Sequence, residues 1–188
     1  SLVIPSVMKK WEDVPAILEL IANDHISHLL CPPGVYRSLL RAVKNQELKS
    51  LEVVSLTGEP WSTMLAQQHI SLCSQASLYN EYGLKEAGSW NTLAKVFDKK
   101  TQNCEEVTIG RPIANTQVYL FNDQQQLVPV GVKGEIYIGG LGLSYSSTHS
   151  QRSEKFIPHP YKQGEILYRT GDLGVYLEDG RIEYMGQL

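Results

Sequence analysis

The sequence predicts an α/β protein in which alternating helices and strands are followed by a region built of strands alone. From Ser1 to about Trp90, amphipathic runs alternate with short apolar runs, which predicts parallel strands joined by right-handed helical crossovers. After about Lys100 the helical periodicity stops, and short β-prone runs separated by turn residues take over. We therefore expect a partial doubly wound α/β sheet layer over residues 1–105, followed by a small distorted β-barrel or sandwich over residues 106–188.

Three amphipathic helices are expected in the first region. Asp13 can cap the first helix, and Pro15 is tolerated in its first turn. The second helix has apolar residues at i, i+3, i+4 and i+7, and a third covers about residues 62–72. The apolar faces consist of Val14, Ile17, Leu18 and Ile21 in the first helix, and of Tyr36, Leu39, Leu40 and Val43 in the second.

Three short apolar runs predict the strands between these helices. The run at 28–31 is stopped by the Pro-Pro-Gly at 32–34, and the run at 51–56 by Thr-Gly-Glu-Pro at 57–60. The third begins at Ser77, and the strand-breaking types Asn80, Tyr82 and Gly83 are expected to end it after Tyr79. The loop after a strand's carboxyl end is where α/β sheets bind ligands, so we expect a site there.

The second half of the chain contains the sequence patterns of strands and hairpins. We expect strands at 117–121, 135–138, 174–177 and 181–184, and Asp179-Gly180 between the last two is a strong hairpin signal. The polar stretch at 144–153 lacks apolar anchors and is expected to be a mobile loop.

Composition excludes several classes of protein. A net charge of −3 over 188 residues gives no basic surface for nucleic acid, and no apolar run reaches the length of a membrane span. The three cysteines are widely spaced and favour a reducing cytoplasm over a disulfide scaffold or a zinc site. His25 and His28 have no accompanying ligand and are interpreted as surface or capping histidines. The first residue is Ser1 rather than Met, which predicts a piece of a longer protein.

Four segments resemble a known family. Asn-Glu-Tyr-Gly-Leu-Lys-Glu at 80–86 is similar to the Asn-x-Tyr-Gly-Pro-Thr-Glu signature of amino-acid adenylation domains in nonribosomal peptide synthetases, within the AMP-forming acyl-adenylate ligase superfamily. Gly-Glu-Ile-Tyr-Ile-Gly-Gly-Leu-Gly-Leu at 134–143, Tyr-Arg-Thr-Gly-Asp-Leu at 168–173 and Gly-Arg-Ile-Glu-Tyr-Met-Gly at 180–186 follow in the family's order. The resemblance implies the α/β and barrel subdomains of acyl-adenylate-forming ligases.

The resemblance also implies roles for individual residues and the cofactors ATP and Mg²⁺. Tyr82 would stack on adenine, Gly83 and Lys85 would lie along the nucleotide, Asp172 would accept hydrogen bonds from the ribose hydroxyls, and Glu86 would bind Mg²⁺. The structural alternatives are a core tyrosine, a turn aspartate and a solvated loop glutamate. Glycines 139, 140 and 142 are not followed by a helix with Lys and Ser or Thr, so they are interpreted as structural rather than as a phosphate-binding loop.

By the same resemblance, six residues would line the pocket for the substrate side chain. A large Trp90 would shorten this pocket, and two hydroxyl groups would add polarity. The first specificity positions of the family fall before Ser1, so the acid cannot be identified. The six residues are Leu30, Ser55, Thr57, Glu81, Ser89 and Trp90.

The sequence departs from the family pattern at several positions. Leu84-Lys85 replaces Pro-Thr, which exchanges a hydroxyl for an ammonium group, and Ser-Tyr-Ser-Ser at 144–147 replaces Ala-Arg-Gly-Tyr. Gly186-Gln187 replaces Gly-Arg, which removes a positive charge. The resemblance puts the family's phosphate loop before this chain and the C-terminal lid with its catalytic lysine after a hinge near Gly186, so no catalytic residue is expected within the 188 residues.

Three functions remain open from the sequence. The first is part of an adenylation domain that activates an amino, hydroxy or keto acid with ATP as acyl-AMP and loads it onto a carrier-protein thiol, with the isolated chain inactive. The second is a degenerate, non-catalytic scaffold, which the changes at Leu84-Lys85 and Gln187 would reflect. The third is part of a free-standing acyl-CoA or aryl-acid ligase, ranked last because the segments at 110–118 and 154–160 look more like the peptide-synthetase branch.

Overall fold

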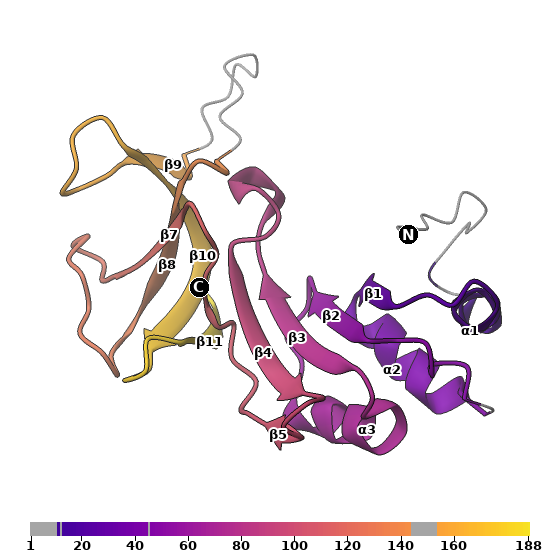
Figure 1. The fold of residues 1–188 in the computed structure, drawn as a ribbon. Helices are drawn as coiled ribbons and strands as arrows, with labels where there is room; N and C mark the ends of the chain where they lie inside the picture. The colour runs from indigo at the N-terminus through magenta and orange to yellow at the C-terminus, as the bar shows by residue number, and fades with distance from the viewer. Residues whose placement is uncertain (1–10, 12, 45, 144–153) are drawn as a thin grey trace, which may run out of the picture. The chain divides into compact units, whose positions relative to one another are not determined.

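The computed structural model describes residues 11, 13–44, 46–143 and 154–188, and Figure 1 traces the chain. Two compact units are formed. The first unit comprises Ser1–Asn80 and Lys95–Val107, and the second comprises Glu81–Ala94 and Thr108–Leu188. The chain thus crosses between the units three times, and the subdomain boundary near residue 105 stays a prediction.

The three expected helices all lie in the first unit: α1 (Val14–Asn23), α2 (Pro33–Ala42) and α3 (Thr63–Cys73). In the predicted apolar face of α1, Ile17, Leu18 and Ile21 are buried and Val14 is half-buried. In α2, Tyr36 and Leu39 are fully buried, and this helix packs against α1, α3 and β2. Val43, predicted within the second helix, instead forms its C-terminal cap.

One sheet contains β1 (His28–Cys31), β2 (Val53–Thr57), β3 (Ser77–Tyr82), β4 (Thr92–Asp98), β5 (Asn103–Cys104) and β6 (Arg111–Pro112). The strand order is β1-β2-β3-β4-β5, and β6 pairs with β4. β1 and β2 are parallel, as the helical crossover between them requires, whereas β4 is antiparallel to β5 and β6. The sheet is therefore mixed.

The predicted end of the third strand is wrong, because β3 continues through Asn80 to Tyr82. The Asn80 side chain is buried, and its Oδ1 accepts a hydrogen bond of 2.9 Å from Trp61 Nε1. This tertiary partner satisfies a polar group that would otherwise favour a turn. β4 was not predicted from the sequence, although its buried and exposed residues alternate over much of its length.

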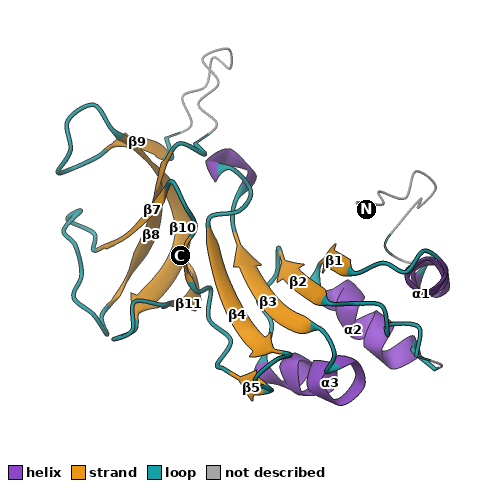
Figure 2. Ribbon diagram, in the orientation of Figure 1, coloured by secondary structure: helices purple, strands orange, loops and turns teal. Residues whose placement is uncertain are grey.

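The second unit contains a curled antiparallel sheet of β7 (Thr116–Phe121), β8 (Lys133–Gly140), β9 (Phe156–Pro158), β10 (Ile166–Tyr176) and β11 (Ile182–Gln187). Its order is β11-β10-β8-β7, with β9 pairing with β10. Figure 2 shows the bend of β10. The inner face buries Leu120, Ile136 and Ile182. An α/β unit and a curled sheet are what the predicted fold class requires, and that class is confirmed.

The expected hairpin at Asp179-Gly180 connects β10 and β11, and the Gly180 N–H donates to the Leu177 carbonyl at 2.9 Å. The Tyr-Arg-Thr-Gly-Asp-Leu segment lies inside β10. The loop predicted at 144–153 lies outside the described residues. No helix in the described part of the chain has the length and apolar character needed to cross a membrane.

We expect Asp13→Ala to destabilise the first unit by about 1 kcal/mol, because the Asp13 carboxylate accepts a hydrogen bond of 3.2 Å from the Ala16 N–H at the start of α1. Asp24→Ala is the matched control, since Asp24 caps the other end of α1 through its backbone N–H and not its side chain. Urea unfolding followed by helical circular dichroism measures both. Equal losses of stability would contradict the capping role.

Candidate functional site

A loop of the second unit, residues 83–91, connects β3 to β4 and is held by one buried amide. The Asn91 side chain accepts a hydrogen bond of 3.1 Å from the Leu84 N–H and donates one of 2.5 Å to the Ala87 carbonyl. The Asn91 N–H donates to the Tyr82 carbonyl at 2.9 Å. Three hydrogen bonds from one buried residue fix this loop, although sequence reasoning did not single it out.

Gly83 allows the loop to fold back on itself. A Cβ at this position would lie 2.0 Å from the Ser89 carbonyl oxygen, a separation that no side chain tolerates. The requirement for glycine at the start of the loop is therefore steric, and it holds whether or not the backbone also contacts a nucleotide.

The same fold brings Tyr82 and Asp172 together, although they are ninety positions apart in the sequence. The Tyr82 hydroxyl donates a hydrogen bond of 2.7 Å to Asp172 Oδ2. Asp172 is 4% exposed, and its second oxygen, Oδ1, is buried with no hydrogen-bond partner among the described residues. A carboxylate oxygen left in this state is ready to accept a donor from a ligand.

Two tyrosine rings lie beside this carboxylate. The rings of Tyr82 and Tyr184 are tilted, with centroids 6.4 Å apart. Burial raises the pKa of Tyr82, and the hydrogen bond to Asp172 raises it further. Burial and the charge of Asp172 likewise raise the pKa of Tyr184. Both hydroxyls therefore stay protonated at neutral pH, and the site combines a carboxylate with two uncharged aromatic rings.

Lys85 and Glu86 lie at the surface of the same unit, in a short 3₁₀ turn, Lys85–Ala87. Both side chains are exposed. No cluster of three or more His, Cys, Asp or Glu suited to a metal ion occurs within the described residues. A cation bound by Glu86 would therefore take most of its ligands from elsewhere.

Gly142, just after β8, packs against this turn, and Gly140 at the end of β8 packs against the start of β7. A Cβ at Gly88, whose φ is +98°, would lie 2.7 Å from the Gly142 carbonyl oxygen. At Gly140, with φ of +116°, a Cβ would lie 2.1 Å from the Asn115 carbonyl oxygen. These close backbone approaches are consistent with a structural role for the glycines.

Three of the predicted substrate residues belong to the first unit. Leu30 of β1 is the register partner of Ser55 of β2, and Thr57 follows Ser55 on the same face two residues on. Leu30 is exposed, and the two hydroxyl residues are partly exposed. The structure thus brings together one apolar and two polar side chains near the carboxyl ends of parallel strands.

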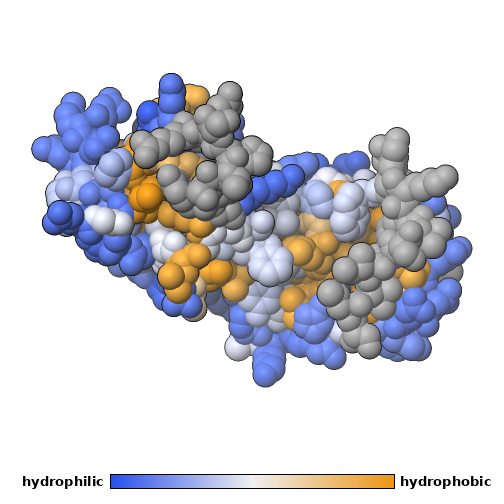
Figure 3. Space-filling model, turned by 90° about the horizontal axis from the view of Figure 1, so that it is seen from above, coloured by the Kyte–Doolittle hydropathy of each residue, from blue (hydrophilic) through white to orange (hydrophobic). Residues whose placement is uncertain are grey.

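The other three predicted substrate residues belong to the second unit. Glu81 precedes Tyr82 in β3, and its Oε2 is buried without a partner among the described residues. Ser89 has a left-handed backbone, with φ of +68°, and Trp90 is 53% exposed. Figure 3 shows hydrophobic side chains reaching the surface in patches on the face seen from above. Trp90 and Leu30 are among the large hydrophobic residues exposed to solvent.

Gln187, where the family has arginine, is the register partner of Asp172 across β10 and β11. Sequence reasoning gave no role to Tyr184 or Glu135. A charged residue inside an apolar run, as in Gly-Glu-Ile-Tyr-Ile at 134–138, could have indicated Glu135, because a carboxylate on a buried strand needs a partner.

Comparison with known proteins identifies the family of the chain. A family model described as AMP-binding enzyme matches residues 1–145. Bacitracin synthase 3 of Bacillus licheniformis is 37% identical over 92% of the chain, and tyrocidine synthase 2 of Brevibacillus parabrevis is 37% identical over 94%. The chain spans only 3% and 5% of the length of these two relatives.

Solved structures show the same fold. The chain superposes on the nonribosomal peptide synthetase FmoA3 (S1046A) with a TM-score of 0.85, at 22% identity, over 98% of this chain and 20% of that one. Klebsiella oxytoca NpsA in complex with 3-hydroxyanthranilyl-AMSN gives a TM-score of 0.77 at 25% identity, over 93% of this chain and 36% of that one. Since the family model covers more than half of the sequence, the chain belongs to the AMP-binding enzyme family.

Proposed function

We propose that the chain forms part of an adenylation enzyme of nonribosomal peptide synthesis. The enzyme would activate an amino, hydroxy or keto acid with ATP as acyl-AMP and transfer the acyl group to a carrier-protein thiol. Its relatives include bacitracin synthase 3 and tyrocidine synthase 2, and NpsA, a structural neighbour, is in complex with 3-hydroxyanthranilyl-AMSN.

One observation carries the proposal: Asp172 is buried beside Tyr82, with Oδ1 free of partners among the described residues. A ribose offers two adjacent O–H donors, and a carboxylate accepts without donating, so the two match. The Tyr82 ring next to this carboxylate supplies a flat apolar surface of the kind that an adenine base stacks on.

The phosphates of the nucleotide would lie near the exposed turn Lys85–Ala87, which follows Tyr82 in the sequence. Lys85 can act as a positive point charge toward phosphate oxygens. Glu86 fits Mg²⁺, because this cation commonly binds one or two protein carboxylates and takes its remaining ligands from water and substrate phosphates. The ion would neutralise phosphate charge when bound. Tyr82, Gly83, Lys85, Glu86 and Asp172 then form the nucleotide part of the proposal.

The carboxylic acid would meet Leu30, Ser55, Thr57, Glu81, Ser89 and Trp90, which combine apolar and hydroxyl groups. The further partners are a lid subdomain and a carrier protein, as the resemblance implies. All three cysteines, Cys31, Cys73 and Cys104, are free thiols. Free thiols, one of them exposed, suit the reducing cytoplasm that we propose as the location.

The test is carboxylate-dependent exchange of pyrophosphate into ATP, measured with the full-length protein across a panel of amino, hydroxy and aryl acids. Exchange with at least one acid is the expected result. The 188-residue chain alone is expected to show none, because the resemblance puts the phosphate loop and the catalytic lysine outside it. Exchange by the isolated chain would refute that expectation.

The hypothesis of a non-catalytic scaffold predicts a different result for the full-length protein. A degenerate domain would show neither exchange nor Mg²⁺-dependent ATP binding by calorimetric titration. Absence of both would overturn the enzyme proposal. Transfer of the acyl group to coenzyme A, with no carrier-protein acylation, would instead favour a free-standing acyl-CoA ligase.

A further inference from the structure

Asp172 pairs with Gln187 of β11 on one side of β10, but regular strand pairing is interrupted beside it on the β8 side. Between β10 and β8, Arg169 pairs with Tyr137 and Leu173 pairs with Glu135, so two extra residues of β10 form a bulge. Gly171 in this bulge has a φ of +83°, which favours glycine. A bulge disrupts the ladder and re-aims a side chain, so on the β8 side contacts other than ladder hydrogen bonds hold the backbone around Asp172.

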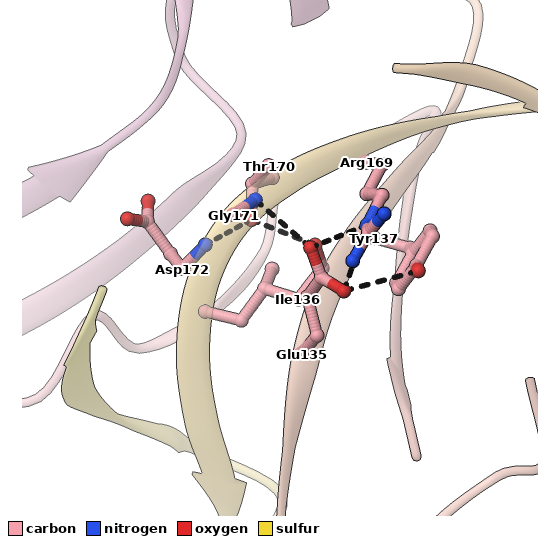
Figure 4. Close-up of polar contacts among 7 residues, drawn as sticks. All are labelled: Glu135, Ile136, Tyr137, Arg169, Thr170, Gly171 and Asp172. Carbon is pink, nitrogen blue, oxygen red and sulfur yellow. Dashed lines mark hydrogen bonds and ion pairs between the residues drawn. The ribbon is translucent and has the colours of Figure 1, made fainter. Parts of the chain in front are cut away.

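The buried carboxylate of Glu135 makes those contacts. Its Oε1 accepts a hydrogen bond of 3.2 Å from the Gly171 N–H and one of 2.8 Å from Arg169 Nε. Its Oε2 accepts from Arg169 Nε at 2.9 Å and from the Tyr137 hydroxyl at 3.1 Å. Figure 4 shows the Asp172 carboxylate pointing away from this cluster. Glu135 therefore contacts the bulge from the side opposite to the Asp172 carboxylate.

Thr170 fixes the bulge independently. Its hydroxyl donates to the Ile136 carbonyl at 2.7 Å and accepts from the Asp172 N–H at 2.9 Å. The backbone N–H groups of Gly171 and Asp172 are thus each bound by a side-chain oxygen, from Glu135 and from Thr170. Two successive N–H groups that would be orphaned by the bulge are satisfied.

We propose that Glu135 is a positioning residue for nucleotide binding: it holds the bulge at 170–172 in the geometry that presents Asp172 to the ribose. The proposal rests on the proposed function, because it assigns Glu135 a part in the binding of the same nucleotide. Glu135 itself acts only through the bulge.

The charge and both oxygens of Glu135 are needed for this role. The substitution Glu135→Gln would keep the shape of the side chain but exchange one acceptor oxygen for an NH₂ group, which faces N–H and O–H donors and cannot accept from them. Burial and the charge of Glu135 raise the pKa of Tyr137 to about 12, so its hydroxyl remains a donor at neutral pH. With its NH₂ turned toward Gly171, the amide would leave that N–H unpaired; turned the other way, it could donate to the Tyr137 hydroxyl. In both orientations the negative charge that pairs with Arg169 is lost.

The experiment is a double-mutant cycle between Glu135→Gln and Asp172→Ala in the full-length protein, read by ATP affinity in isothermal titration. Glu135→Gln alone is expected to weaken ATP binding about tenfold, and to add nothing in the Asp172→Ala background. Thr170→Val, which disturbs the same bulge from its other contact, is expected to behave in the same way and serves if Glu135→Gln does not fold.

Two controls separate positioning from plain stability. Tyr137→Phe removes a hydrogen bond to Glu135 but leaves the Gly171 contact, so it is expected to lower the melting temperature while ATP affinity stays within about twofold. Glu183→Gln changes an exposed carboxylate on the neighbouring strand β11 and is expected to change neither.

The outcomes are distinguishable. If folded Glu135→Gln and Thr170→Val both bind ATP within about twofold of the unsubstituted protein, or if their effects persist in the Asp172→Ala background, the positioning role is overturned. If Asp172→Ala itself leaves ATP affinity unchanged, the proposed nucleotide site fails, whatever the Glu135 variants do.

Discussion

Replacing Asp172 by alanine is expected to weaken ATP binding by the full-length protein by at least about tenfold, since a hydrogen bond to a charged group contributes roughly 1.5 to 3 kcal/mol. The variant removes the acceptor of the Tyr82 hydroxyl and the free Oδ1 together. Because Asp172 is 4% exposed, the lost bonds are not replaced by the bulk solvent that would compensate at an open surface.

Isothermal titration with ATP and with 2′-deoxyATP and 3′-deoxyATP measures this effect. The unsubstituted protein should prefer ATP over both analogues, and Asp172→Ala should lose most of that preference. Asp123→Ala, at an exposed position in the β7–β8 turn, is the matched control and should leave all three affinities unchanged. An Asp172→Ala variant with unaltered ATP affinity would remove the ribose assignment.

Asp172→Asn tests whether the number of hydrogen-bond acceptors or the negative charge determines ATP affinity. The amide oxygen can still accept one ribose hydroxyl, while the NH₂ group cannot accept the other. Its affinity should therefore fall between those of the unsubstituted protein and Asp172→Ala. An affinity at or below that of alanine would indicate that charge, rather than the number of acceptors, dominates the interaction.

The helical part of the fold could be predicted because local rules act there without help from the rest of the chain. Asp13 caps α1 through its own third neighbour, and the buried residues of α1 and α2 follow the 3.6-residue period. β3 could not be delimited, because the Trp61 contact that keeps Asn80 in a strand comes from nineteen residues away. Turn propensity depends only on residues close in the sequence, and a contact with a residue distant in the sequence can override this propensity.

In the candidate site too, some residues could be predicted from the sequence and others depend on contacts that form only on folding. Tyr82 and Asp172 were identified through motifs, and the structure brings them into contact. Asn91, which holds the loop at 83–91, and Glu135, which holds the bulge at 170–172, carry no motif signal of their own. Their importance depends on backbone groups that only the folded chain brings to them, so single-sequence reasoning had no means of ranking them.

The first unit is expected to lose about 3 kcal/mol of unfolding free energy as the pH falls from 6.5 to about 4, because of one buried histidine. His69 is fully buried: its Nδ1 lies 2.6 Å from the Tyr36 hydroxyl and its Nε2 2.9 Å from the Ala76 carbonyl. Burial lowers the pKa of His69 from 6.5 to about 4, although the Ala76 carbonyl opposes this effect. The neutral ring donates from Nε2 and accepts from Tyr36 through Nδ1.

The sign follows from proton counting. Between pH 6.5 and 4 the unfolded chain protonates His69 while the folded unit keeps it neutral, so the unfolded state binds more protons. Stability from this group is therefore complete above the unfolded pKa and is lost as the pH falls toward the folded one. Each pKa unit corresponds to about 1.4 kcal/mol, which sets the size of the loss.

Urea unfolding between pH 4 and 7.5, followed by helical circular dichroism, isolates the effect, because α1, α2 and α3 all belong to the first unit. His69→Gln should flatten the pH dependence, whatever it does to stability at neutral pH. His25→Gln, at an exposed position, should retain the original slope. Burial also lowers the pKa of His159, but that residue lies in the second unit. A first-unit slope that survives in His69→Gln would show that other groups titrate there.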